Sequence, residues 1–190
     1  YRESVVERYG IVVYQVNDLI NTLTPKFNAL FGYDKAIKNF TDFYTLNQPD
    51  TTTNNYTNKY KDKNIIFVHL ESIQSYLLGM SFNGVEVIPS LNKLVKESTY
   101  FDHFYPQISV GTSSDTEFTL LTSLMPAQSG TVFISYYDRK YIAMPELLKE
   151  KGYYTFSMHG NKAEMWNRKI MHPNLGYTDF FSKKDFVNYI

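Results

Sequence analysis

A short, uninterrupted apolar run at residues 64–70 constrains the fold more than any other feature of this sequence. The run reads Asn-Ile-Ile-Phe-Val-His-Leu and is followed directly by Glu71 and Ser72. A strand that is covered on both faces in a parallel sheet has this pattern. The later pattern predicts further strands at 99–104 and 153–158, and helices at 89–98, 114–124 and 145–151. Alternating strands and helices predict an α/β domain with a mostly parallel sheet flanked by helices.

The chain before this run is organised differently. Residues 1–46 are predicted to be a helical arm, because apolar residues recur there at helical spacing: Val5, Tyr9, Val12, Val16, Leu19 and Leu23. Pro25 is expected to end the first helix, and a second helix is expected at 35–44. Residues 47–63 contain no aliphatic side chain and are interpreted as a polar linker. The main predicted domain then covers residues 64–190.

Composition narrows the classes of function. The 190 residues carry 19 basic and 19 acidic side chains, so the formal charge is zero and no bulk attraction to nucleic acid is expected. There is no cysteine, which excludes disulfides, thiolate metal sites and cysteine nucleophiles. No run approaches the roughly 18 apolar residues of a membrane span. Because the sequence opens on Tyr1 without a methionine, we expect a longer parent chain that carries any membrane anchor.

Two candidate site features lie where α/β folds place their ligands, beyond the carboxyl ends of strands. Glu71 directly follows the run at 64–70 and could ligate a hard divalent cation. It could equally be an acid favoured at a helix start. The second feature is the hydroxyl-rich segment 111–117, in which Ser114 and Glu117 have the spacing of a capping box. A hydroxyl there could be a nucleophile beside free backbone N–H groups, or simply part of a well-capped helix.

A third feature follows the strand expected at 153–158. His159 closes that strand, and Asn161, Trp166 and Arg168 come soon after it. Together they offer a hydrogen-bond donor, an aromatic wall and a guanidinium that can grip an anion with two donors. Taken separately, Trp166 is interpreted as a core residue and Arg168 as a surface ion pair. His69, His103 and His172 are not assigned to a site.

These segments, in this order and spacing, resemble the extracellular domain of the lipoteichoic acid synthases, which belong to the sulfatase and alkaline-phosphatase-like superfamily. The resemblance covers about residues 64–182. It rests on the runs 64–75, 83–94, 113–118, 158–161 and 165–168. It implies the N-terminal part of an alkaline phosphatase/sulfatase-like domain.

The resemblance also implies a function. Such a protein would be a polytopic membrane protein of Gram-positive bacteria, with its catalytic domain on the extracellular face or released after cleavage. It would take part in cell wall biogenesis by moving glycerol phosphate from phosphatidylglycerol to a glycolipid anchor or a growing polyglycerolphosphate chain, with release of diacylglycerol. The family uses a manganese or magnesium ion and a covalent enzyme intermediate on a threonine. Whether this chain would start the polymer or extend it stays open.

Site residues carry over position by position. Glu71 matches the metal-binding glutamate, and His159, Asn161, Trp166 and Arg168 match positions that hold glycerol phosphate. The family often has an acid where this chain has Asn161. The family's nucleophile directly precedes a Ser-Asp pair and also ligates the metal. When the Ser-Asp pair of this chain is aligned with that pair, Ser113 takes the nucleophile position.

The family's habit of using threonine favours Thr112 at that position instead. The family's remaining metal ligands, an Asp-His pair, match no residue before Ile190. We therefore expect the rest of the catalytic domain to pack against these residues and complete the site.

Two alternatives remain at this point. A metal-dependent phosphodiesterase of the same fold would transfer the group to water. An inactive module would bind the polymer or the lipid headgroup without turnover. A true sulfatase is disfavoured, because the Cys/Ser-x-Pro/Ala-x-Arg context of its modified nucleophile is absent from the sequence.

Overall fold

The computed structural model describes residues 2–128 and 130–186, and these divide into two compact units at residues 66 and 67. The first unit holds two long helices that contact each other, α1 (Arg2–Leu30) and α2 (Tyr33–Leu46). Among the described residues, no helix combines the length and apolar character needed to cross a membrane. The segment 47–66 that follows α2 contains turns and no helix or strand.

Helix α1 corrects one expectation about the arm. Pro25 does not end the helix, which continues to Leu30, and Gly32 with φ +87° then separates it from α2. The break inside α1 lies instead at Gly10, whose φ of +81° and ψ of 160° are far from helical values. Glycine has no Cβ and adopts this conformation without steric cost. Proline removes one N–H donor from the helix, but the helix can continue beyond it.

The second unit begins with a 3₁₀ turn and a small hairpin. These elements are η1 (Ser75–Leu77), β1 (Ser81–Phe82), β2 (Val85–Glu86) and α3 (Pro89–Glu97). Strands β1 and β2 are antiparallel. The Asn92 side chain, which is buried, accepts a hydrogen bond from the Gly79 amide at 2.9 Å and donates one to Glu86 at 2.8 Å. This side chain therefore closes the hairpin onto α3, whose start at Pro89 confirms the predicted helix.

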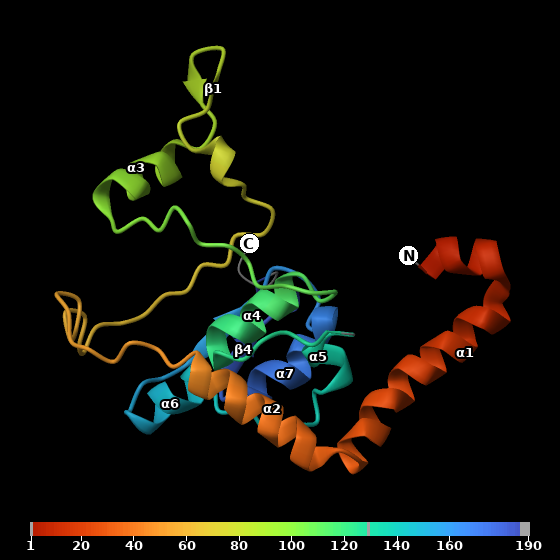
Figure 1. Cartoon of the computed structure of the whole chain (residues 1–190). Coiled ribbons are helices and arrows are strands. Elements are labelled where there is room, and N and C mark those ends of the chain that lie inside the picture. The colour runs from red at the N-terminus through yellow and green to blue at the C-terminus, as the bar shows by residue number, and fades with distance from the viewer. Residues whose placement is uncertain (1, 129, 187–190) are drawn as a thin grey trace. The chain divides into compact units, whose positions relative to one another are not determined.

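The remaining elements form the packed part of this unit. They are α4 (Ser113–Thr122), α5 (Val132–Ser135), α6 (Met144–Glu150), β3 (Phe156–Met158), η2 (Met165–Asn167), α7 (Arg168–Asn174), β4 (Asp179–Phe181) and α8 (Lys183–Phe186). Strands β3 and β4 are parallel, with Ser157 opposite Phe180. Figure 1 shows α4, α5, α6, α7 and β4 gathered in this part of the chain. Helix α4 contacts α5 and α6, and α7 contacts β4. The buried apolar core joins these elements: Phe118, Val132, Phe133, Ala143, Met171 and Leu175.

Two predicted strands are absent from the described structure. Residues 64–70 are extended but unpaired and exposed, with Ile66 showing 85% of its surface. Residues 99–104 form no strand either. A strand needs a neighbour that takes up its backbone N–H and C=O groups, and no strand of the described residues lies beside either segment. The parallel sheet is therefore limited here to β3 and β4, so the mostly parallel sheet is seen only as this pair.

The other predicted elements of this unit are confirmed with shifted ends. Helices α4 and α6 form at the predicted places, and α6 stops where Gly152 adopts φ +86°. The strand predicted at 153–158 is confirmed for its last three residues as β3. The helices packed around the parallel strands β3 and β4 position the site.

Candidate active site

The hydroxyl-rich segment 111–117 lies at the start of α4. Thr112 takes the N-cap position with φ +44° and ψ −108°, and Ser113 is the first residue of the helix. The half-buried Ser113 hydroxyl donates a hydrogen bond of 2.8 Å to Oε1 of Glu71, which is 42 residues earlier in the chain. The Thr112 side chain is exposed. Of the two hydroxyls singled out by sequence, it is therefore Ser113 that the structure brings to the Glu71 carboxylate.

The predicted capping box between Ser114 and Glu117 is wrong. Ser114 is fully buried and donates its hydroxyl proton to the Gly111 carbonyl at 2.8 Å, backwards along the chain. No side chain caps α4, and Glu117 points away from the helix start into a cluster of charged residues. The box fails because Glu117 finds stronger partners there than a single backbone N–H.

Glu117 is the centre of a buried charged cluster that joins three elements. Its carboxylate pairs with the guanidinium of Arg168 on α7, through Nε at 3.0 Å and through a second guanidinium nitrogen. It also lies 3.1 Å from Nε2 of His172, whose Nδ1 is 2.7 Å from the Ser157 hydroxyl on β3. The cluster therefore ties α4, α7 and β3 together.

Electrostatics in this cluster favour an ionised carboxylate. Burial by itself would raise the pKa of Glu117, but hydrogen bonds from His172 and Arg168, together with their positive charges, lower the pKa to about 2. Arg168 is predicted to hold phosphate, but its side chain is only 3% exposed. Its guanidinium donates hydrogen bonds to the Glu117 carboxylate and to the Met165 carbonyl. The surface ion pair weighed for Arg168 is thus a buried one.

His159 follows β3, and its backbone is fixed there by an N–H bond of 2.9 Å to the Phe181 carbonyl on β4. Its Nδ1 accepts the Asn161 amide proton at 3.3 Å, so in the neutral ring the proton is assigned to Nε2. Burial lowers the pKa of His159 and the charge of Arg168 lowers it further, while the carboxylates of Glu117 and Glu71 oppose the shift. His159 is therefore a neutral donor at pH 7, within electrostatic range of Glu71.

Asn161 and Trp166 lie in the segment between β3 and α7. The exposed Asn161 accepts the Lys162 amide proton at 2.7 Å and donates to the Met165 sulfur at 2.9 Å. Trp166 is half-buried against the core, with φ +54°, so the core interpretation describes its packing here. The next residue, Asn167, donates to the Phe133 carbonyl at 2.9 Å. The substrate-holding roles of Asn161 and Trp166 stay predictions.

Sequence reasoning missed the buried polar residues of the site. Sequence spacing places Glu117 only in a capping box, and it assigns neither Asp115 nor His172 to a site. Met171 and His172 lie three and four residues after Arg168 on α7, so both share a side of the helix with it, and all three are buried. That helical spacing was the signal that could have marked His172.

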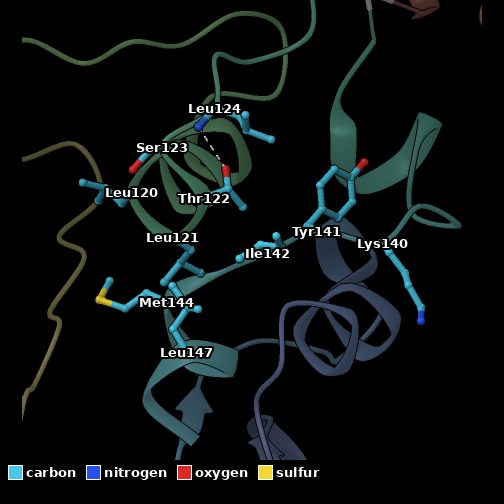
Figure 2. A pocket seen from close by; sticks show the side chains of 10 residues that line it. All are labelled: Leu120, Leu121, Thr122, Ser123, Leu124, Lys140, Tyr141, Ile142, Met144 and Leu147. Carbon is cyan, nitrogen blue, oxygen red and sulfur yellow. Dashed lines mark hydrogen bonds between the residues drawn. The ribbon is translucent and has the colours of Figure 1, made fainter. Parts of the chain in front are cut away.

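A pocket lies at the other end of α4, around its carboxyl end. It is predominantly apolar and measures about 660 Å³. Figure 2 shows the side chains of α4 and of residues 140–147 that line it: Leu120, Leu121, Thr122, Ser123, Leu124, Lys140, Tyr141, Ile142, Met144 and Leu147. Since the Ser113 hydroxyl lies at the other end of this ten-residue helix, the pocket is separate from the Glu71–Ser113 pair.

A sulfatase-type domain is the class that this geometry defines: a hydroxyl at a helix start, a carboxylate after an apolar run, and a histidine after a parallel strand. The Sulfatase family profile matches residues 63–190, and the chain belongs to this family. The predicted resemblance and fold class are thereby confirmed.

Relatives agree with this assignment. The chain is 37% identical over 188 residues to the lipoteichoic acid synthase-like protein YvgJ of Bacillus subtilis (strain 168), covering 97% of this chain and 30% of that protein. It is 37% identical over 142 residues to the lipoteichoic acid synthase of Staphylococcus aureus (strain USA300), covering 73% and 22%.

A solved structure is similar too. The crystal structure of the lipoteichoic acid synthase LtaP from Listeria monocytogenes matches with a TM-score of 0.56 and 32% identity, over 58% of this chain and 27% of that chain. The chain thus spans less than a third of the length of these relatives.

Proposed function

We propose that this chain is the N-terminal part of a glycerol phosphate transferase that acts in lipoteichoic acid synthesis. The transferase would move glycerol phosphate from phosphatidylglycerol to a glycolipid anchor or to the growing polyglycerolphosphate chain. The similarity to proteins named lipoteichoic acid synthase supports this reaction class. The single observation that carries it in this chain is the 2.8 Å contact between the Ser113 hydroxyl and Glu71.

Ser113 is proposed as the nucleophile in preference to Thr112. A nucleophilic hydroxyl needs a group within hydrogen-bond reach that stabilises its deprotonated form or accepts its proton. Ser113 has such a contact with Glu71, whereas the Thr112 side chain is exposed and its backbone caps the helix. Choosing Thr112 on the family's habit alone would leave the hydroxyl nearest to the carboxylate without a role.

The donor set suits a hard divalent cation such as manganese or magnesium. Glu71 and Ser113 supply a carboxylate and a hydroxyl oxygen, the ligand types that such ions prefer. Among the described residues, no three His, Cys, Asp or Glu side chains gather as a metal group, so further ligands are proposed to come from the rest of the domain. A bound cation would lower the pKa of the hydroxyl and neutralise phosphate charge.

The chain's own residues then divide the work. The Ser113 oxygen attacks phosphorus, so that a bond from that oxygen to phosphorus forms as the bond from phosphorus to the diacylglycerol oxygen breaks. The serine proton passes to the Glu71 carboxylate, which returns it to the diacylglycerol oxygen as that group leaves. Neutral His159 donates from Nε2 to a phosphate oxygen, and Asn161 and Trp166 are proposed around the glycerol phosphate. Arg168, buried against Glu117, is proposed to favour the phosphate by its positive charge. A glycerol hydroxyl of the acceptor then attacks phosphorus, the bond from phosphorus to the Ser113 oxygen breaks, and the acceptor's hydroxyl proton ends on that serine oxygen.

We also propose where in the cell the reaction takes place. The substrates are lipids of a bacterial membrane, so the catalytic domain is proposed to work at the extracellular face of the cell membrane. The anchor would be a segment of the longer protein, and α1 and α2 would link it to the catalytic domain. No part of this proposal involves nucleic acid.

The test uses the protein that carries the whole family domain. With manganese and headgroup-labelled phosphatidylglycerol, we expect label release and a labelled peptide that contains Ser113. Ser113→Ala and Glu71→Ala should abolish both, while Thr112→Ala should retain the adduct. Label trapped on Thr112 would refute the choice of nucleophile. Binding of glycerol phosphate without turnover or adduct would refute the transferase and leave the binding module, and release of free glycerol phosphate to water alone would indicate the phosphodiesterase.

A further inference from the structure

Asp115 is a fully buried carboxylate in the first turn of α4 that the proposed reaction does not use. Its Oδ2 accepts two backbone hydrogen bonds, from the Ser109 amide at 2.9 Å and from the Gly111 amide at 2.9 Å. Its Oδ1 is buried with no hydrogen-bond partner. An acceptor left unpaired in a protein interior costs stability, so this carboxylate is kept at a cost that its two amide bonds must offset.

The loop held by Asp115 is enclosed from other sides as well. A side chain at Gly111 has no room, because a Cβ there would lie 2.3 Å from Oδ1 of Asp115 and 2.5 Å from the Thr131 hydroxyl oxygen. Ser114 donates to the Gly111 carbonyl at 2.8 Å and lies 3.0 Å from the same Thr131 oxygen. The backbone of residues 109–111 is thus fixed through both its amides and its carbonyl.

The chain leaves this enclosed loop in a strained conformation. Thr112 has φ +44°, a region of backbone conformation that β-branched residues rarely enter. Such strain persists only where surrounding contacts over-determine the backbone. The next residue is Ser113, whose hydroxyl meets Glu71. The strain therefore lies at the peptide that aims the proposed nucleophile.

We propose that Asp115 is a positioning residue: by clamping the Ser109 and Gly111 amides it holds Thr112 in its strained conformation and so directs the Ser113 hydroxyl at Glu71. This inference rests on the proposed transferase function, and it adds a residue that touches neither substrate nor metal. A carboxylate suits the task because it accepts both amides with one oxygen and lies at the positive end of the α4 dipole.

The consequence is specific to the chemical step. Loss of the clamp lets Thr112 relax towards an ordinary backbone conformation, which turns Ser113 away from Glu71. A misplacement of about 1 Å at a reacting group can cost about a hundredfold in rate. Substrate binding depends on other groups, so the loss should fall on kcat and not on KM.

The experiment measures kcat and KM for label release in the protein that carries the whole family domain. Asp115→Ala is expected to lower kcat about a hundredfold with KM within about twofold. Asp115→Asn keeps an acceptor oxygen and should recover about tenfold of that loss. Asn92→Ala is the matched control, because Asn92 is also a buried side chain that accepts a loop amide, in the β1–β2 hairpin. It should leave kcat unchanged.

Four outcomes decide the proposal. An Asp115→Ala protein with the parent's kcat overturns the clamp and leaves the transferase intact. Equal losses of kcat in Asp115→Ala and Asn92→Ala overturn it too, because they indicate a general effect of weaker folding. If Asp115→Ala does not fold, Gly111→Ala tests the same clamp from its other side, and a parent-like kcat there overturns it. A parent protein without turnover or adduct refutes the proposed function and, with it, any role for Asp115 in the reaction.

Discussion

Replacing Glu117 by glutamine should destabilise the protein at neutral pH and have no such effect in acid. Glutamine keeps the shape of the side chain but removes its charge, so Arg168 stays buried without a counter-ion. The pKa of Glu117 lies at about 2 instead of its ordinary value of 4.5. At roughly 1.4 kcal/mol per pH unit, the ionised carboxylate therefore contributes about 3 kcal/mol to the free energy of unfolding. Breaking a buried ion pair by removing one partner typically costs about 3–5 kcal/mol, which agrees.

The pH dependence follows from the direction of the shift. A carboxyl group whose pKa is lowered by folding contributes its full stability above its unfolded pKa and loses it as the pH falls through the folded pKa. The difference between the parent protein and Glu117→Gln should therefore be constant above about pH 5 and shrink towards zero at about pH 2.

The assay is equilibrium urea denaturation of both proteins at a series of pH values. Asp42→Asn is the control, because its pair with Lys38 is exposed, with 74% and 53% of the two side chains accessible. Such a pair at helical spacing is worth about 0.3–0.5 kcal/mol. A cost below about 1 kcal/mol for Glu117→Gln at pH 7, or a cost that does not fall between pH 5 and pH 2.5, would refute the reasoning.

Two further outcomes are expected. In NMR titrations, the pKa of the His159 imidazole should lie below its ordinary value of 6.5, because the ring is partly buried and lies near Arg168. Glu71→Gln should lower this pKa further by removing a negative charge. A pKa that rises in Glu71→Gln would contradict the assigned neighbours. Phe133→Ala should cost about 3–5 kcal/mol in urea denaturation, because Phe133 is fully buried in the core. Ile142→Ala, at a position that is 75% exposed, serves as its control and should change stability by less than about 0.5 kcal/mol.

Local signals in the sequence predicted α3, α4 and α6, whereas Pro25 does not end α1 and the short helices α5, α7 and α8 were not predicted. Pro89 and Gly152 each mark a helix boundary by their own backbone preference, and the structure agrees at both. Strands depend on partners that local sequence does not contain. The run 64–70 has the composition of a buried strand, yet it stays unpaired in the described structure, because pairing is a property of two segments and not of one.

The candidate site was predictable in its outline and not in its contacts. Glu71 was singled out by its place after an apolar run, and the choice between Thr112 and Ser113 needed a three-dimensional neighbour. The spacing of Ser114 and Glu117 predicted a capping box. The true partner of Glu117 is Arg168, which is 51 residues away, and no spacing rule connects these two residues. Long-range polar pairs of this kind were the part that sequence reasoning could not supply.

The contacts of the Glu117 cluster hold α4 and β3 in a fixed position relative to each other. One end of α4 carries Ser113, and β3 leads directly into His159, so the two groups that would act on a phosphate are borne by elements locked through Glu117, Arg168 and His172. Moving one against the other would require breaking the Glu117 contacts with Arg168 and His172 or the hydrogen bond between His172 and Ser157. A site built this way has little reorganisation left to do when the substrate arrives, and any opening or closing around the lipid must come from other segments.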